Sequence, residues 1–432
     1  MTWAAYPLVT RRLIIARALR SLGQGMMVVN FTLYLRALGW HAADIGLLLT
    51  ASGLVGAALS LAVGYFSDRH GRKRFILAYE TLTVLAGILA VLTWNPYVLS
   101  TASIVASFGR GQSGGAGPFG PAEQAWITRA VEPGLRSRLF SLNAAIGFVG
   151  MGLGALAAGS VVLFQHWLPG AAAFRPLFLL PALGSGINLL LIVPLREERA
   201  DSDATTTVAS AHERDRLRDE EAAVTRHENR EMAKLAFTNS LNGLAVGLTG
   251  PLIAYWFAVR YGVSPAAIGG LLAVSFLATG FSNLATGRIA ERAGVVRTVA
   301  GIRILGVVML VVMTLMGTFF WAAIFYFLRS MLNRGSVGAR QAVSLSLTRD
   351  KRRGLAASLN VVSMRVPASV GPTVAGYLMD DGNLTLPFFI GAGLQTLYAL
   401  TYARLFRHYN DALGPDRRAE KAAPFPTHSA GA

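Results

Sequence analysis

The chain has 432 residues, of which 53% are hydrophobic and only 15% are charged, and its mean hydropathy is +0.46. Soluble domains average about 25% charged residues, so this composition excludes an ordinary soluble protein. The net charge of +17 would suit an acidic partner, while the absence of Cys excludes disulfides, a thiol nucleophile and a Cys-ligated metal.

Long apolar runs follow one another along the chain. A transmembrane helix needs about 20 mostly apolar residues, and 49–66, 75–94 and 139–164 are runs of this kind. The pattern predicts an all-α integral membrane protein. Its expected twelve spans lie at 12–37, 44–66, 75–94, 98–128, 138–164, 174–195, 233–259, 265–287, 298–318, 319–347, 355–379 and 384–406.

Basic residues gather in alternate loops and at both ends of the chain. They crowd 69–74, 288–297 and 349–353, whereas the turns at 95–97 and 380–382 carry none. This is the positive-inside pattern, with both termini cytoplasmic. A basic surface that faces an anionic leaflet explains the net charge, so the expected partner is a lipid bilayer and not nucleic acid. We expect a multi-pass protein of a bacterial cytoplasmic membrane.

The interval 196–234 is charged and polar and lacks apolar periodicity, with one possible amphipathic helix at 213–222. It predicts a cytoplasmic linker at 196–232 between two six-helix bundles, at 1–195 and 233–407. Residues 408–432 read as a cytoplasmic tail.

The two bundles resemble each other in sequence. HAADIGLL at 41–48 aligns with SPAAIGGL at 264–271, a shift of 223, and the same shift aligns GYFSDRHGRKR at 64–74 with GRIAERAGVVR at 287–297. Spans four and five align with ten and eleven at a shift of 217, which pairs Glu123 with Arg340. Ungapped matches of this kind indicate duplication, and parallel six-span repeats place a binding site between the halves.

The stretch 64–74 places two glycines, an acid and several bases between spans two and three. It resembles the signature loop G-x-x-x-D-R-x-G-R-[RK] of the major facilitator superfamily. R110-G-Q-S-G114 in span four is similar to the family's R-x-x-x-G pattern, and G154-A-L-A-A-G159 matches the antiporter pattern of span five without its proline. The resemblance covers the whole chain and implies a gradient-driven secondary transporter that uses alternating access.

The resemblance also implies that the signature loop is a cytoplasmic gate. Its glycines let backbones approach closely, and Asp68 can accept hydrogen bonds from a helix N-terminus. Many relatives carry an acid near the end of span four, where this chain has Arg129 and a possible substitute in Glu132. The predicted gating residues are Gly64, Asp68, Arg69, Gly71 and Arg72, with Glu291 and Arg292 in the repeat copy.

Ionisable residues inside membrane spans are costly, so each is a functional candidate. The spans contain eight such arginines and two glutamates: Arg17, Arg20, Arg110, Arg303, Arg329, Arg334, Arg340, Arg365, Glu80 and Glu123. The resemblance places spans one, four, seven and ten around the cavity. Arginine binds carboxylate or phosphate through two parallel hydrogen bonds, so the sequence predicts a small anionic substrate. The predicted binding residues are Arg20, Gln24, Arg110, Gln124, Arg329, Asn333 and Arg340.

Other roles remain open for several of these charges. Arg17, Arg303 and Arg365 have the alternative of anchoring span ends at the interface, and Arg110 that of bracing helices. Glu80 and Glu123 are the candidates for carrying a proton, since a carboxyl in an apolar site can take one up near neutral pH. Glu80 has the alternative of balancing Arg72 or Arg74, and Glu123 that of pairing with Arg340 across the halves.

The sequence lacks the motifs of ATP-driven transport and of hydrolytic enzymes. It has no GxxxxGK[ST] loop and no HExxH pair, and its seven histidines form no metal-ligand cluster. We therefore expect no enzymatic activity, cofactor or metal, and a monomeric transporter. The favoured function is anion transport. The alternatives are proton-coupled efflux of drug-like amphiphiles and, from another class, a transporter-like membrane sensor.

Overall fold

The computed structural model describes residues 6–109, 117–131, 136–197, 211–335, 340 and 353–407, and in these ranges the chain is helical with no strand. The first half contains α1 (Leu8–Ala37), α2 (Ala42–His70), α3 (Arg72–Leu92), α4 (Pro96–Ala106), α5 (Gly120–Arg129), α6 (Arg136–Ala157), η3 (Ala158–Ser160), α7 (Val161–Phe164), η4 (Gly170–Phe178) and α8 (Leu179–Ile192). The second half contains α9 (Ala211–Thr249), α10 (Ile253–Tyr261), α11 (Pro265–Ala293), α12 (Val295–Leu315), α13 (Phe319–Gly335), α15 (Arg353–Asp380) and α16 (Leu386–Leu405).

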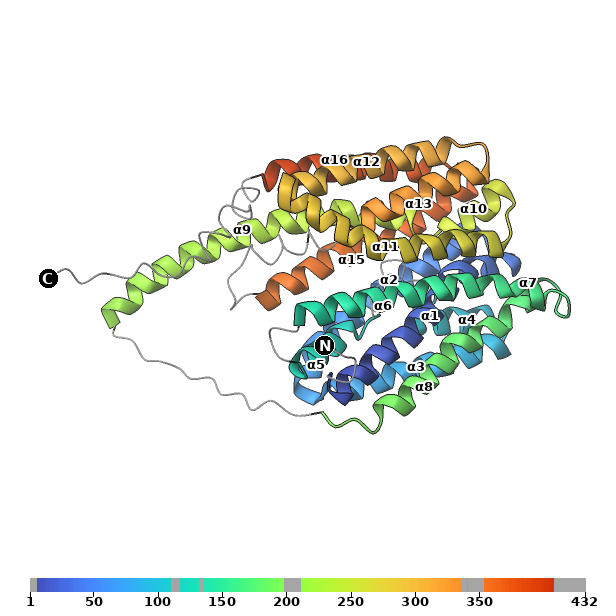
Figure 1. Ribbon diagram of the computed structural model, residues 1–432, viewed down its shortest axis with the longest axis horizontal. Coiled ribbons are helices and arrows are strands. Elements are labelled where there is room, and N and C mark those ends of the chain that lie inside the picture. Colours follow the sequence, from blue (N-terminus) through green and yellow to red (C-terminus); the bar gives the residue numbers. More distant parts are fainter. Residues whose placement is uncertain are drawn as a thin grey trace.

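The two halves are helical bundles that lie side by side, as the sequence predicts (Figure 1). Within the described residues, six helical segments are long and apolar enough to cross a membrane by length and composition alone: Ala42–Ser67, Arg72–Leu92, Ser141–Phe164, Gly170–Ile192, Val224–Tyr261 and Val295–Leu315. The predicted span one, which carries five arginines in α1, is not among these, and neither is span four, which is divided between α4 and α5. Large aliphatic side chains on the outer faces, such as Leu92, Leu163 and Leu190, are exposed, as expected where lipid covers them.

Two of the predicted spans are broken helices. Span four divides into α4 and α5, and Ser107, the residue that ends α4, adopts a left-handed conformation with φ of 55°. Span seven divides at Gly250 and Pro251 between α9 and α10. Broken spans leave backbone groups unpaired near the middle of the bundle, a recurrent way of building polar sites in transporters.

The helix α9 occupies part of the interval that the sequence predicts as a linker. It begins at Ala211, inside the interval expected to be a polar linker, and runs without interruption into span seven. Its first turns project beyond the bundle (Figure 1). Glu228 and Glu231 on this helix are buried, and Glu231 pairs with Lys234 at 2.5 Å.

The duplication seen in the sequence is repeated in the packing of glycines. A Cβ on Gly25 of α1 would collide with the backbone oxygen of Met151 on α6, and a Cβ on Gly247 of α9 would collide with that of Ala368 on α15. Met151 and Ala368 differ by 217, the shift that relates these spans in the sequence. Each half therefore packs its first span against its fifth in the same way.

The halves meet tightly at one end of the bundle, here called the closed end, which holds the turns at 38–41, 262–264 and 381–385. There Gly46 of α2 lies against the backbone of Pro372 on α15, and the hydroxyl of Thr373 donates to that of Thr50 at 2.6 Å. The carboxylate of Asp380 accepts hydrogen bonds from the backbone N–H groups of Ala42 and Ala43, both at 2.8 Å. This carboxylate caps α2 from the other half of the molecule, where the helix dipole favours an anion.

We expect Asp380→Asn to loosen the closed end. An amide replaces a charge-assisted cap that contributes about 1 kcal/mol, so the population opened at this end should rise about fivefold. Because the chain has no Cys, a single Cys introduced at Thr50 can report opening by its rate of alkylation. The matched control is Asp381→Asn on the neighbouring exposed residue. Equal alkylation rates in the two variants would rule out a role for this cap in sealing the halves.

Candidate functional site

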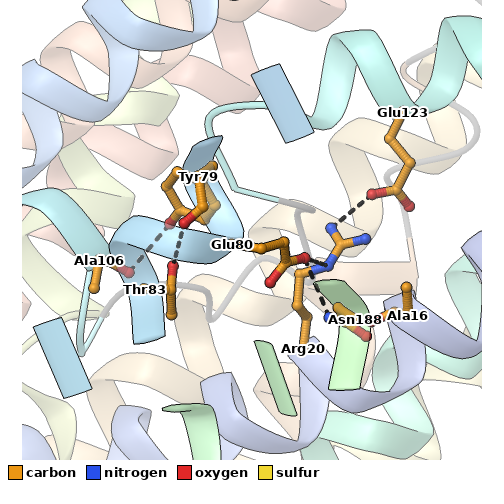
Figure 2. A network of polar contacts seen from close by, with 8 residues as sticks. All are labelled: Ala16, Arg20, Tyr79, Glu80, Thr83, Ala106, Glu123 and Asn188. Carbon is orange, nitrogen blue, oxygen red and sulfur yellow. Dashed lines mark hydrogen bonds and ion pairs between the residues drawn. The ribbon is translucent and has the colours of Figure 1, made fainter. Parts of the chain in front are cut away.

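Three charged side chains meet inside the first half. The Arg20 guanidinium on α1 lies between two carboxylates, with its Nε 2.9 Å from Glu80 Oε1 on α3 and its Nη1 2.6 Å from Glu123 Oε2 on α5 (Figure 2). The Arg20 side chain is 5% exposed, and both glutamate side chains are fully buried. One positive charge therefore balances two potential negative charges in a site that excludes water.

Neighbouring groups hold this triad in place. Asn188 of α8 donates from its amide nitrogen to Glu80 Oε1 at 3.1 Å and to the backbone oxygen of Ala16 at 3.2 Å. The Arg20 guanidinium also lies 4.4 Å from the centre of the Phe119 ring, a favourable cation–π position. Within the described residues Glu80 Oε2, Glu123 Oε1 and Asn188 Oδ1 are buried without a hydrogen-bond partner. The site is thus rich in acceptors, which suits a proton or a donor group.

The partners of the two glutamates in this triad differ from the alternatives that the sequence offered for them. Glu80 lies against Arg20 and not against Arg72 or Arg74, because it points into the bundle toward α1. Glu123 pairs with Arg20 of its own half and not with Arg340 across the halves. Since its charge is already compensated, Arg20 offers little attraction to an anionic substrate.

A small pocket with a volume of about 30 Å³ adjoins the triad. It lies between α1, α3, α8 and the break after α4, entirely inside the first half. Tyr79 closes one side, donating from its hydroxyl to the last backbone oxygen of α4, that of Ala106, at 3.1 Å (Figure 2). The lining combines polar and apolar side chains: Arg20, Gly23, Gln24, Met27, Tyr79, Thr83, Ala106, Ser107, Phe108, Pro181 and Ser185.

The second half contains buried arginines of a different character. Arg329 of α13 is 8% exposed and donates from Nη2 to the hydroxyl of Thr249 at 3.0 Å, at the break of span seven. Arg303 of α12 is 2% exposed and donates to the backbone oxygen of Asn333 at 3.4 Å. Arg334 lies over the Phe276 ring at 4.4 Å. No carboxylate in the part of the chain that the structure describes forms an ion pair with these three.

The remaining predicted binding residues are scattered. Gln24 lines the cavity beside Arg20, whereas Gln124 is exposed. The side chain of Asn333 packs against Gly306 of α12. Arg340 is half-buried, and Arg110 lies outside the described residues. The described members of the predicted set therefore do not form a single cluster, because Arg20 and Gln24 line a pocket of the first half and Arg329 lies in the second.

The signature stretch forms a capped turn between two helices. Gly71 has φ of 91°, a conformation that other residues rarely adopt, and it ends α2 and starts α3. Glu197, just after α8, accepts hydrogen bonds from the backbone N–H groups of Arg72 and Lys73, both at 2.9 Å. Lys73 in return donates to the backbone oxygens of Val193 and Leu195, at 2.6 and 2.7 Å. This loop is anchored to span six of its own half.

Other predicted gating residues are only partly described. The Arg72 side chain is buried and donates to the backbone oxygen of Ala125 on α5 at 3.4 Å, and Arg69 lies over the Tyr65 ring on the surface. In the repeat copy Gly294 has φ of 85°, close to the value at Gly71, and Arg292 is exposed. The side chains of Asp68 and Glu291 lie outside the described set.

Two site residues were missed from the sequence. Asn188 interrupts the apolar run of span six, and a polar residue within a span was the available signal. Glu197 lies in the run REER that ends this span, where one acid among several charges gives no indication of its partner. In the described residues no group of three or more His, Asp or Glu side chains is arranged to hold a metal ion.

Comparison with known proteins places this geometry in a family. The profile of the Major Facilitator Superfamily matches residues 13–224 and 235–430. An uncharacterized membrane protein of Saccharomyces cerevisiae, YJR124C, is 22% identical over 428 residues, covering 93% of this chain and 94% of the yeast protein.

Two solved structures show the same fold. One is a bacterial homologue of the human lysosomal transporter Spinster, in an inward-facing and unoccupied conformation, with a TM-score of 0.67, 14% identity and 97% and 98% of the two chains covered. The other is the nucleoside transporter NupG, as a D323A mutant, with a TM-score of 0.69, 14% identity and 92% and 100% covered.

We expect Arg20→Met to destabilise the protein by about 3–5 kcal/mol, because it leaves two buried carboxylates without a counter-charge. The triple variant Arg20→Met, Glu80→Gln, Glu123→Gln removes every charge of the triad and should recover most of this loss. Thermal unfolding of the purified variants measures both effects. Arg69→Met, at an exposed arginine, is the control. A triple variant no more stable than the single one would contradict the triad as a charge-balanced unit.

Proposed function

The chain belongs to the major facilitator superfamily and is a membrane transporter rather than an enzyme, and we propose that it moves a small anion by gradient-driven alternating access. The buried arginines of the second half carry this proposal. Arg329 is the best candidate among them for contact with substrate, because it donates to Thr249 at the break of span seven, and transporters often bind substrate at a broken span. Its Nε has no hydrogen-bond partner within the described residues, so a donor remains for a ligand.

An anion is the ligand that this environment favours. A guanidinium holds a carboxylate or phosphate through parallel hydrogen bonds, and the low dielectric of the interior strengthens the attraction. The fold relatives do not decide the substrate, since NupG is a nucleoside transporter at 14% identity. An anionic substrate is instead supported by the guanidinium of Arg329, which forms no ion pair with a carboxylate in the described part of the chain, and Asn333 on the same span is a supporting candidate.

We place the closed end outside the cell. Bases concentrate at the opposite end, beside the termini, and the positive-inside rule makes that end cytoplasmic. With its outer end sealed by α2 against α15, the transporter is in an inward-facing state, as the solved Spinster homologue is. A monomer in a bacterial plasma membrane fits this orientation, with 408–432 as a cytoplasmic tail.

The signature loop is proposed as the cytoplasmic gate. The hydrogen bonds from this loop to Glu197 connect α3 to the end of span six, so that α2, α3 and α8 move together. The loop can then contact the second half as part of one rigid surface when the cytoplasmic end closes. Gly64, Asp68, Arg69, Gly71 and Arg72 would supply the gate in the first half. Glu291 and Arg292 would supply its counterpart in the repeat.

The test is ligand binding to the purified protein. A panel of dicarboxylates, phosphate, sulfate and lipophilic cations is screened by thermal unfolding, because binding to the folded state raises the melting temperature. We expect anions to stabilise the parent and Arg329→Ala to weaken that binding about 10- to 100-fold, since a hydrogen bond to a charged group contributes about 1.5–3 kcal/mol. Arg329→Lys should retain part of the affinity. Arg260→Ala, at an exposed arginine of α10, is the control.

Stabilisation by lipophilic cations alone would contradict the anion proposal and favour the second candidate, proton-coupled efflux of amphiphiles. The unpaired oxygens of Glu80 and Glu123 beside a cavity favour this candidate. In it the two glutamates carry the proton, and Arg20 would exchange partners as one of them is protonated.

Proton coupling has a separate test in proteoliposomes. We expect Glu123→Gln to abolish accumulation driven by a pH gradient while solute exchange continues, because an amide cannot take up the proton and exchange needs no net proton movement. Full uphill transport by this variant and by Glu80→Gln would exclude both residues as carriers. Any measured flux would also exclude the third candidate, a transporter-like sensor.

A further inference from the structure

The repeat relates the acids of the triad to bases in the second half. At the shift of 223 that aligns the second and third spans with the eighth and ninth, Glu80 corresponds to Arg303. At the shift of 217 that aligns spans four and ten, Glu123 corresponds to Arg340. Both carboxylates that hold Arg20 are thus replaced by guanidinium groups.

The residue equivalent to Arg20 follows from the packing of the first span of each half. Gly25 faces the backbone of Met151 as Gly247 faces that of Ala368, and Met151 and Ala368 are repeat equivalents. Gly25 and Gly247 therefore correspond, which is a shift of 222. Applied to Arg20, this shift gives Asn242, which is fully buried and whose Oδ1 has no hydrogen-bond partner in the described residues.

The charge pattern of the first half is therefore inverted in the second. In the first half a cation lies between two carboxylates; in the second half the positions of the two carboxylates carry guanidinium groups, and the position of the cation carries a neutral amide. Arg303 is 2% exposed and Arg340 is half-buried, and in the repeat they occupy the positions of Glu80 and Glu123, the two carboxylates that contact Arg20. The Nε atoms of both arginines are buried with no hydrogen-bond partner among the described residues. Two like charges, one buried and one half-buried, are strongly unfavourable without a counter-ion, and no described carboxylate forms an ion pair with either of them.

One face of α16, beside Arg303, carries groups that can donate hydrogen bonds. The Arg303 guanidinium lies 5.6 Å from the centre of the Tyr398 ring, and Tyr398 and Tyr402 stack at 5.6 Å between ring centres. Both phenol hydroxyls are buried and have no partner in the described part of the chain, and the same holds for the side-chain amide of Gln395. Gln395, Tyr398 and Tyr402 are spaced to share one face of α16. Guanidinium, phenol and amide donors together suit an anion.

We propose that a small inorganic anion, a halide or an oxyanion, binds inside the second half between Arg303 and Arg340. The anion is the counter-charge of the second half, as Arg20 is in the first half, but with the opposite sign. It allows the helices of this half to pack around buried charges. The occupant is free in solution and not a lipid headgroup, since Arg303 lies eight residues inside α12 and is buried. The site does not depend on which solute is transported.

The test compares anions at constant ionic strength, with thermal unfolding of the full-length protein as the readout. Chloride, bromide or sulfate replaces gluconate, which is too large for a buried site. We expect a saturable rise of the melting temperature by about 2 °C or more in the parent, by mass action. The rise should vanish in Arg303→Gln and persist in Arg292→Gln, at an exposed arginine. A parent whose melting temperature is the same in all four salts overturns the proposal.

Asn242→Asp is a second test of the anion site, which can be used if Arg303→Gln fails to fold. Aspartate is isosteric with asparagine and supplies a negative charge within the protein, at the position where the first half has its counter-charge. We expect this variant to melt higher than the parent in gluconate and to lose the response to chloride. A variant that melts lower in gluconate and still responds fully to chloride would contradict the proposal.

Arg329→Ala separates this site from the proposed substrate site. The chloride response should persist in Arg329→Ala, because Arg329 donates to Thr249 at the break of span seven, whereas Arg303 donates to the backbone oxygen of Asn333. A response that is lost in Arg329→Ala and retained in Arg303→Gln would overturn the internal anion site and assign the effect to substrate binding. Loss of substrate binding in Arg329→Ala together with a retained chloride response supports both proposals independently.

Discussion

The structure depends on how charge is compensated where water is excluded. Arg20 lies between Glu80 and Glu123, and these three residues come from α1, α3 and α5, with Asn188 of α8 as a fourth support. A single buried charge would be prohibitively costly, so each member requires the others, and four separated segments are held in one arrangement. The break of span four fits this arrangement because it carries Glu123 on a separate helix that can be placed independently of α4.

The two repeats carry charges of opposite sign at equivalent buried positions, Glu80 in the first half and Arg303 in the second. The packing of glycines on neighbouring backbones is retained in both halves, as Gly25 and Gly247 show, whereas the charged interior has diverged. Alternating access requires each half to move as a rigid body, so an internal charge network is as useful in one half as in the other. In the first half the network is complete within the chain. In the second half the described residues supply hydrogen-bond donors and positive charge. A negative counter-charge would have to come from an anion in solution.

Helix caps from distant segments join these bundles at the ends of the spans. Asp380 caps α2 across the two halves, and Glu197 caps α3 from the end of span six. The two contacts have the same chemistry, a carboxylate on free backbone N–H groups, and different consequences. The first joins the halves and so bears on the conformational equilibrium. The second ties the signature loop to its own half. The signature stretch 64–74 therefore also holds α3 against the end of span six, through Lys73 and the backbone N–H groups that Glu197 caps, in addition to any gating role.

The sequence by itself determined the class of protein, the spans, the duplication and the family, because these follow from apolar run lengths, loop charges and internal alignment, all of which are local or periodic. It also identified Glu80, Glu123 and Arg20 as unusual. It did not indicate that they form one cluster, since helical phase relates residues within a span and says nothing of which spans meet. The caps by Asp380 and Glu197 and the contacts of Arg20 with Glu80 and Glu123 join segments up to 338 residues apart. Only the tertiary structure decided these, because the free energy of a buried charge depends on which groups of other spans surround it.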